Sequence, residues 1–67
     1  MKMKDLKPGM VFINNLGHAT MIVYVSSRSA PVVKIGYLYA GINSGHATLS
    51  SFHIDADEDL FDDYILT

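Results

Sequence analysis

The chain has 67 residues, no cysteine, 49% hydrophobic residues and a formal net charge of −2. This length allows one small domain, residues 1–67, and the apolar content argues against a disordered chain. The lack of cysteine excludes disulfides and thiolate metal sites, and it is typical of a reducing compartment such as the cytoplasm. Since a core this small gives marginal stability, we expect a homo-oligomer.

The charge is divided unevenly along the chain. Residues 1–34 contain five basic residues and one acid, a sum of +4, whereas residues 35–67 contain six acids and no base, a sum of −6. A net acidic domain is a poor binder of nucleic acid, because affinity for phosphates rests on Lys and Arg. The longest apolar run, residues 21–25, is far shorter than the ~20 residues of a membrane-spanning helix. We therefore expect a soluble protein that makes no membrane contact.

Four strands are predicted before the acidic C-terminal segment, each bounded by turn residues. Residues 10–13 form the first strand, after the turn sequence Lys7-Pro8-Gly9. Residues 18–26 form the second, and its two largely apolar faces are typical of a central strand. Small polar residues and a proline at 26–31 predict a break before the third strand, residues 32–39. Residues 47–54 form the fourth, which is an edge candidate because it contains two serines.

The alternation of side chains along each strand assigns them to faces. In the second strand, Ile22 and Tyr24 share a face. In the third, Tyr37 and Tyr39 share the face that we expect to be the core, because Lys34 lies on the other. If Lys34 instead faces a partner, the two tyrosines are exposed.

The C-terminal segment allows two interpretations. Asp55 with Glu58 three residues later is typical of a helix start, and the apolar residues at 60, 61, 64 and 65 fit one helical face. Alternatively, a single helical turn precedes a closing strand at residues 63–66. We favour the second interpretation, because Asp62 and Asp63 are poor residues for a helix interior and four open strands require closure.

The predicted fold class is all-β, with five short strands separated by turns. The sequence LKPGMVF at residues 6–12, followed by this layout of strands and a short helical turn before the last one, resembles the opening of an SH3-like barrel. The resemblance implies a small five-stranded barrel. Binding of proline-rich peptides is not carried over, because the chain has no tryptophan for such a platform. In size and composition the chain is also similar to short accessory proteins that phages encode.

A short repeat is the most unusual feature of the sequence. Residues 15–20 read NLGHAT and residues 43–48 read NSGHAT, and an aromatic residue follows each threonine by four positions. Each copy opens a predicted strand, so two loop edges can present imidazole, hydroxyl and amide groups to a nucleotide or another small anion between subunits. Ordinary turn and strand chemistry produces the same pattern, so both interpretations stay open. The ligand-binding interpretation uses His18, Thr20, Tyr37, Tyr39, His46 and Thr48.

The acidic segment, residues 55–63, supplies a different hypothesis. Its alternating carboxylates resemble a calcium loop, but its sixth position is Leu60 and its twelfth is Leu66, where such a loop needs Gly and Glu. Closely spaced carboxylates instead steer a protein toward a basic surface, and Leu60 and Phe61 are expected to anchor this turn to the core. The alternative is a solvated acidic turn that maintains solubility. The residues expected to bind a basic protein partner are Asp57, Glu58, Asp59, Asp62 and Asp63.

No metal, cofactor or catalytic site is predicted. The three histidines lack the spacing of a metal motif, and His46 and His53 fall on opposite faces of a straight strand. No serine lies in a nucleophile elbow, and no glycine-rich phosphate loop opens a helix. We therefore expect a non-catalytic binding module that acts as an inhibitor or accessory factor on a protein partner. A binder of a small anionic ligand is the second hypothesis, and a structural subunit of a larger assembly is the third.

Overall fold

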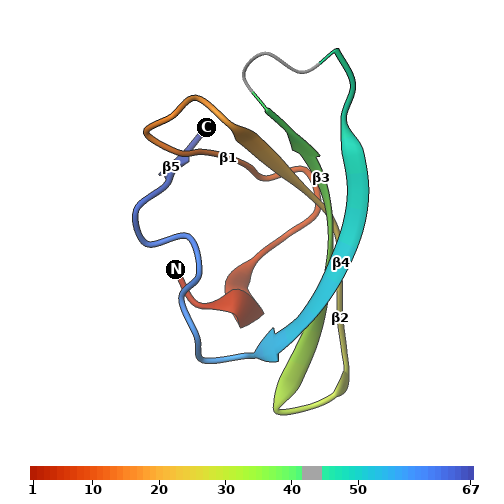
Figure 1. Ribbon diagram of the computed structural model, residues 1–67. Helices are drawn as coiled ribbons and strands as arrows, with labels where there is room; N and C mark the ends of the chain where they lie inside the picture. The colour runs from red at the N-terminus through yellow and green to blue at the C-terminus, as the bar shows by residue number, and fades with distance from the viewer. Residues whose placement is uncertain (42–44) are drawn as a thin grey trace.

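The computed structural model, which describes residues 1–41 and 45–67, is a single antiparallel sheet of five strands (Figure 1). The strands are β1 (Val11–Ile13), β2 (Ala19–Ser29), β3 (Val32–Ala40), β4 (Thr48–Asp55) and β5 (Ile65–Leu66). A 3-10 helix, η1 (Met3–Asp5), is the one helical element in this part of the chain, and it is too short to cross a bilayer. The prediction of a mostly β protein is confirmed.

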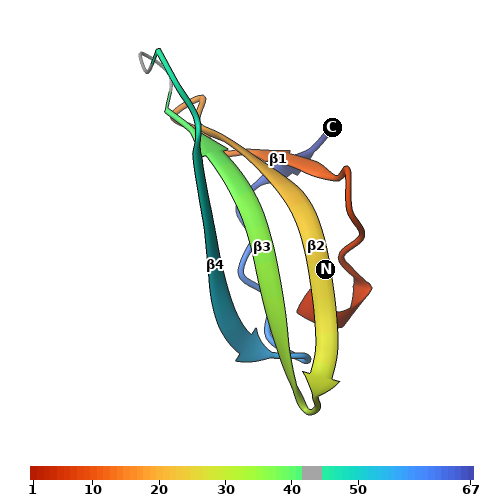
Figure 2. The same cartoon turned by 90° about the vertical axis from the view of Figure 1, so that its right-hand side faces the viewer.

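The order of the strands across the sheet is β4-β3-β2-β1-β5. The long strand β2 is therefore central and the serine-containing β4 lies at one edge, as the sequence predicts. Figure 2 shows β2, β3 and β4 running side by side. Register pairs such as Met21↔Leu38 and Leu38↔Leu49 connect these three strands.

The sheet is strongly curved but not closed. In Figure 1, β2, β3 and β4 bend around one side of the molecule, and the segment after β4 crosses the open side to reach β5. There, β5 pairs with β1 through Phe12↔Leu66 and Ile13↔Ile65. Within residues 1–41 and 45–67, no ladder joins β4 to β5, so the barrel stays a prediction.

The hairpin between β2 and β3 is tighter than the sequence predicts. The expected break at residues 26–31 is wrong, because β2 continues to Ser29 and pairs there with Val32. Only Ala30 and Pro31 remain for the turn, and the peptide bond between them is cis. The backbone of this stretch therefore continues the hairpin ladder instead of ending the strand.

A β-bulge at Val23 changes which residues of β2 face the core. Ile22 pairs with Tyr37 and Tyr24 pairs with Gly36, so Val23 is an extra residue in the ladder. An extra residue reverses the alternation of side chains. Ile22 is fully buried, whereas Tyr24 is exposed and its ring occupies the space beside Gly36 where a Cβ would be. The prediction that Ile22 and Tyr24 share a face is therefore wrong.

The C-terminal segment consists of turns followed by β5. The amide of Glu58 donates to the carbonyl of Asp55 at 3.1 Å, and the amide of Tyr64 donates to the carbonyl of Phe61 at 3.0 Å. This arrangement confirms turns followed by a last strand and rules out a helix over residues 56–66, but the expected helical turn is wrong, because residues 56–64 form turns and bends. The closing strand is shorter than expected, since only Ile65–Leu66 pair with β1.

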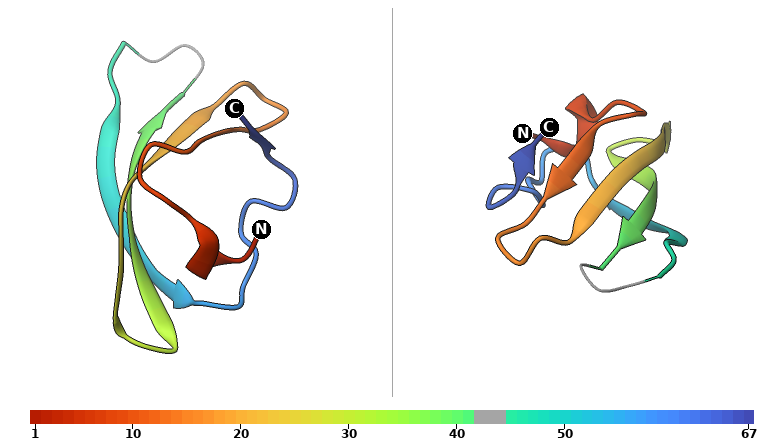
Figure 3. Two further views of the ribbon diagram at one scale, coloured as in Figure 1. Left: turned by 180° about the vertical axis from the view of Figure 1, so that it is seen from behind. Right: turned by 90° about the horizontal axis from the view of Figure 1, so that it is seen from above.

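The core fills the space between the concave face of the sheet and the segments that cross it. Its buried residues are Met3, Leu6, Phe12, Ile22, Val33, Ile35 and Phe61. The N-terminal segment lies beside the acidic segment (Figure 3), where the Met3 amide donates to the Glu58 carbonyl and the Lys4 amide donates to the Ala56 carbonyl. Backbone hydrogen bonds thus hold the start of the chain against its acidic segment.

Candidate binding site

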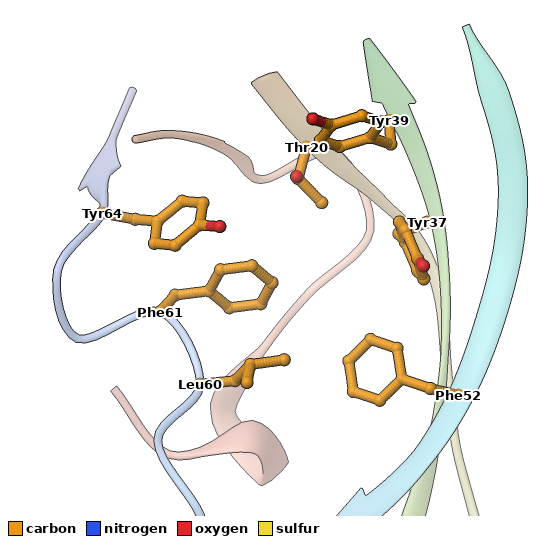
Figure 4. A pocket seen from close by; sticks show the side chains of 7 residues that line it. All are labelled: Thr20, Tyr37, Tyr39, Phe52, Leu60, Phe61 and Tyr64. Carbon is orange, nitrogen blue, oxygen red and sulfur yellow. The ribbon is translucent and has the colours of Figure 1, made fainter. Parts of the chain in front are cut away.

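A pocket of about 310 Å³ lies between the concave face of the sheet and the C-terminal segment (Figure 4). Strands β2, β3 and β4 form one wall, and the turn at residues 60–64 forms the other. The lining residues are Thr20, Tyr37, Tyr39, Phe52, Leu60, Phe61 and Tyr64. The lining is therefore mainly aromatic, with hydroxyl groups as its polar component.

Two edge-to-face aromatic pairs form the opposing walls. On the sheet, the ring centroids of Tyr37 and Phe52 are 5.5 Å apart at an interplanar angle of 64°. On the C-terminal segment, those of Phe61 and Tyr64 are 5.0 Å apart at 85°. Phe61 also stacks on Phe12 with 4.4 Å between centroids, which fixes this wall to the core. Such pairs contribute about 0.5–1.5 kcal/mol beyond the burial of their area, so both walls are held in place.

Tyr37 and Tyr39 face the concave side, as the sequence predicts, but neither belongs to the buried core that was expected there. Both line the pocket, and Tyr39 lies at its rim with 37% of its surface exposed. The Tyr39 hydroxyl is 2.7 Å from Nδ1 of His18, and the two rings meet edge to face. His18 does not line the pocket itself, but it contacts the pocket through Tyr39.

Thr20 is the buried polar residue of the site. It is only 5% exposed, and Figure 4 shows its side chain extending from β2 into the space between the walls. Its hydroxyl has no hydrogen-bond partner among the described residues, and it keeps some contact with solvent, since no fully buried polar side-chain atom there lacks a partner. The same holds in this part of the chain for the hydroxyls of Tyr37 and Tyr64. These three groups are available to a ligand.

The sheet brings together the threonines of the two repeat copies. Thr20 pairs with Tyr39, and Tyr39 pairs with Thr48, so one row across the concave face contains both threonines. Thr48 and His46 are exposed and do not line the pocket. The predicted ligand site is thus assembled only in part. Residues 43 and 44 of the second copy lie outside the described residues.

The first copy of the repeat follows ordinary turn chemistry. Oδ1 of Asn14 accepts hydrogen bonds from the amides of Leu16 at 3.0 Å and His18 at 2.9 Å. Gly17 takes a φ of +85°, which glycine adopts without a steric penalty. The aromatic residues after the two threonines are not equivalent, since Tyr24 points outward and Phe52 lines the pocket. The turn explains the glycine of this copy and the asparagine just before it, Asn14, but not the Asn15 that the two copies share.

The five acids predicted to bind a partner are all exposed, but they fall into two groups. Asp57 lies 3.4 Å from Nζ of Lys4 and 3.7 Å from Nζ of Lys2, and Asp59 pairs with the ammonium of Met1 at 2.7 Å. Part of the positive charge of the N-terminal segment is therefore neutralised by acids of the same molecule. The acids that have no described ion-pair partner are Glu58, Asp62 and Asp63.

Four lining residues were not among the predicted site residues: Phe52, Leu60, Phe61 and Tyr64. Alternation in β4 places Phe52 on the concave face. Phe61 is the anchor expected within the acidic turn, with 7% of its surface exposed, whereas Leu60 is 49% exposed and lines the pocket instead of the core. That Phe61 and Tyr64 meet the sheet tyrosines depends on the path of the C-terminal segment, which composition does not reveal.

Metal ligands do not converge in the part of the chain that the structure describes. No group of three or more His, Asp or Glu side chains there has the geometry to hold an ion. Asp55 uses its carboxylate locally, since Oδ1 accepts a hydrogen bond from the Asp57 amide at 2.8 Å.

Comparisons of the chain with protein-family models, with curated proteins and with solved structures each find no match.

Proposed function

We propose that this protein is a non-catalytic binding module, an inhibitor or accessory factor whose target is a protein with a basic surface. The observation that carries the proposal is the position of the acidic turn beside an aromatic pocket. Asp62 and Asp63 are exposed and stand in the chain between Phe61 and Tyr64, which both line the pocket. The cytoplasm is the setting we propose, on the basis of the cysteine-free sequence.

The electrostatics of the acidic turn support a basic partner. Lys2 and Lys4 partly neutralise Asp57, but Glu58, Asp62 and Asp63 keep uncompensated charges within six residues. Exposed carboxylates of one sign raise the rate of association with a cationic surface, and this effect weakens with salt over a Debye length of about 8 Å at physiological ionic strength. An aromatic pocket beside such a charge supplies the desolvated centre that stable interfaces require.

The test is binding of a fluorescein-labelled peptide of alternating arginine and glycine, followed by fluorescence anisotropy at low and high salt. Replacement of the unpaired acids, in the triple variant Glu58→Gln, Asp62→Asn and Asp63→Asn, is expected to abolish binding at both salt concentrations. The matched control is Asp57→Asn with Asp59→Asn, which removes the internally paired acids and is expected to weaken binding less. Equal affinity of the triple variant and the unmodified protein would contradict the proposal.

A small anionic ligand, such as a nucleotide held between subunits, is a second candidate. It is favoured by the convergence of Thr20, Tyr37 and Tyr39 on one pocket, where the Tyr39 hydroxyl is also hydrogen-bonded to His18. It is disfavoured by the charges of the neighbouring turn. A nucleotide that raises the melting temperature, with the rise lost in His18→Ala, would support it. No rise with any nucleotide of a broad panel would exclude it.

We also propose a homo-oligomer, assembled through the open edge of β4. An edge strand presents unpaired backbone groups that another strand can use. The convex face adds an apolar row of register-paired residues, Val11, Met21, Leu38 and Leu49, and Leu49 at the edge is 66% exposed. Native mass spectrometry is expected to show an oligomer that Leu49→Lys dissociates. A monomer at the highest soluble concentration would contradict this assignment.

For the fold, we propose a partly open SH3-like barrel. The support is the return of β5 to β1, which turns the last strand toward the open side of a curved sheet. The short strands and the crossing C-terminal segment in Figure 1 are consistent with this description. An experimental structure in which the segment after Asp55 leaves the concave face would contradict it.

A further inference from the structure

The aromatic pocket has the chemistry of a site for a planar cation. We propose that it receives one arginine side chain of the basic partner, an inference that rests on the function proposed above. The site consists of the two aromatic walls, the Thr20 hydroxyl between them and the acidic turn beside them.

The walls suit a guanidinium group. Tyr37 and Phe52 stand opposite Phe61 and Tyr64 across the pocket in Figure 4, so a planar group between them meets aromatic rings on both sides. Guanidinium is planar, delocalised and more weakly hydrated than ammonium, and it stacks on tyrosine and phenylalanine. The volume of about 310 Å³ accommodates one long side chain with a few water molecules.

The hydroxyl groups disfavour a purely apolar occupant. Thr20 is 95% buried, and its hydroxyl has no hydrogen-bond partner in the described part of the chain. A leucine or phenylalanine in the pocket would desolvate this hydroxyl without pairing it, which is costly. Guanidinium instead carries five N–H donors, and the hydroxyl oxygens of Thr20, Tyr37 and Tyr64 can accept from them.

The charges disfavour a phosphate or carboxylate occupant. No Lys or Arg lines the pocket within the described residues, and the turn that forms its second wall contains Asp62 and Asp63. An anion would lose its hydration without a Lys or Arg of the lining to pair with, and two carboxylates stand next in the chain to lining residues. A lysine ammonium is a compact, strongly hydrated point charge that cannot stack between two rings, so arginine is the better match.

The experiment titrates the full chain with N-acetyl-arginine amide and follows the Thr20 methyl and the Tyr37 and Tyr64 ring signals by NMR. We expect saturable shifts at these residues. N-acetyl-citrulline amide, which has the same shape without the charge, and N-acetyl-lysine amide are the matched probes. The neutral citrulline probe is expected to bind roughly fivefold to thirtyfold more weakly, the range that a partly desolvated cation–π contact supplies. The lysine probe keeps its charge but is also expected to bind more weakly, because its ammonium is more strongly hydrated and does not stack.

Two conservative variants locate the site without removing its walls. Thr20→Val replaces the hydroxyl by a methyl group of similar shape, and Tyr64→Phe keeps the ring. Each is expected to weaken the binding of N-acetyl-arginine amide at least threefold, because each deletes one hydrogen-bond acceptor, while the spectrum stays that of a folded protein. Unchanged affinity in both variants would overturn the assignment of this pocket.

The outcomes separate this inference from the proposed function. If the arginine–glycine peptide binds in a manner that depends on the acidic turn while the pocket signals do not move, the function stands and the pocket assignment fails. If citrulline or lysine binds as tightly as arginine, the assignment to arginine also fails. If the peptide does not bind at all, the proposed function fails, and pocket shifts with N-acetyl-arginine amide then show a site for a free guanidinium compound.

Discussion

Phe61 fixes the C-terminal segment to the sheet, so its removal is the most informative perturbation of the fold. Its side chain is 7% exposed, stacks on Phe12 at 4.4 Å and meets the edge of Tyr64 at 5.0 Å. Truncation of a buried phenylalanine to alanine costs about 3–5 kcal/mol. A chain of this length has a total stability of about 3–10 kcal/mol, at ~0.05–0.15 kcal/mol per residue. Phe61→Ala is therefore expected to remove a third of the stability or more.

The assay is urea unfolding followed by circular dichroism. With a slope of about 1 kcal/mol per molar for a small domain, the midpoint of Phe61→Ala should fall by about 3 M or more, or the variant should be unfolded without denaturant. Leu60→Ala is the matched control on the same turn, since Leu60 is 49% exposed and its loss should cost about 1 kcal/mol or less. A Phe61→Ala midpoint no lower than that of Leu60→Ala would refute the assignment of Phe61 as the anchor.

Three further predictions concern the charges, the convex face and the pocket. Asp57→Asn removes two exposed ion pairs and should lower the free energy of unfolding in urea by less than about 1 kcal/mol, with no difference in high salt. A larger loss, or one that does not depend on salt, would contradict the ion-pair account. Gly36→Ala should displace the Tyr24 ring and lower the free energy of unfolding by about 1 kcal/mol, whereas in a protein that already carries Tyr24→Ala it should cause no further loss. An equal loss with and without Tyr24→Ala would argue against the contact. Thr20→Val should leave the melting temperature unchanged or raise it, because the hydroxyl has no described partner to lose; a clear fall would reveal a hydrogen bond.

The strand plan could be predicted largely from local signals. Turn residues such as Pro8 and Gly9 mark where strands begin, and Gly9 indeed takes a φ of +94°. Two apolar faces identified β2 as central, and serines at 50 and 51 identified β4 as an edge. The concave orientation of Tyr37 and Tyr39 followed from Lys34 on the opposite face of the same strand. Each of these inferences uses a property of a few neighbouring residues.

The features that could not be predicted depend on contacts between distant parts of the chain. Nothing about Val23 distinguishes it as the extra residue of a bulge, because the bulge is defined by the pairing of β2 with β3. A three-residue helix such as η1 is too short to show a period, and Met3 is buried through tertiary packing that brings it beside Glu58. The pocket could not be predicted for the same reason, since its second wall exists only where the C-terminal segment crosses the sheet.

The same return of the C-terminal segment determines when the molecule can fold during synthesis. The β2–β3 hairpin involves residues close in sequence, but the core needs Met3 and Phe61 together, and β1 stays unpaired on one side until Ile65 and Leu66 arrive. Contacts between distant residues slow folding, because the chain must close a large loop before it gains their energy. The nascent chain therefore exposes the edge of β1 and an apolar concave surface until residues 61–66 leave the ribosome, and it is most prone to aggregation before that point.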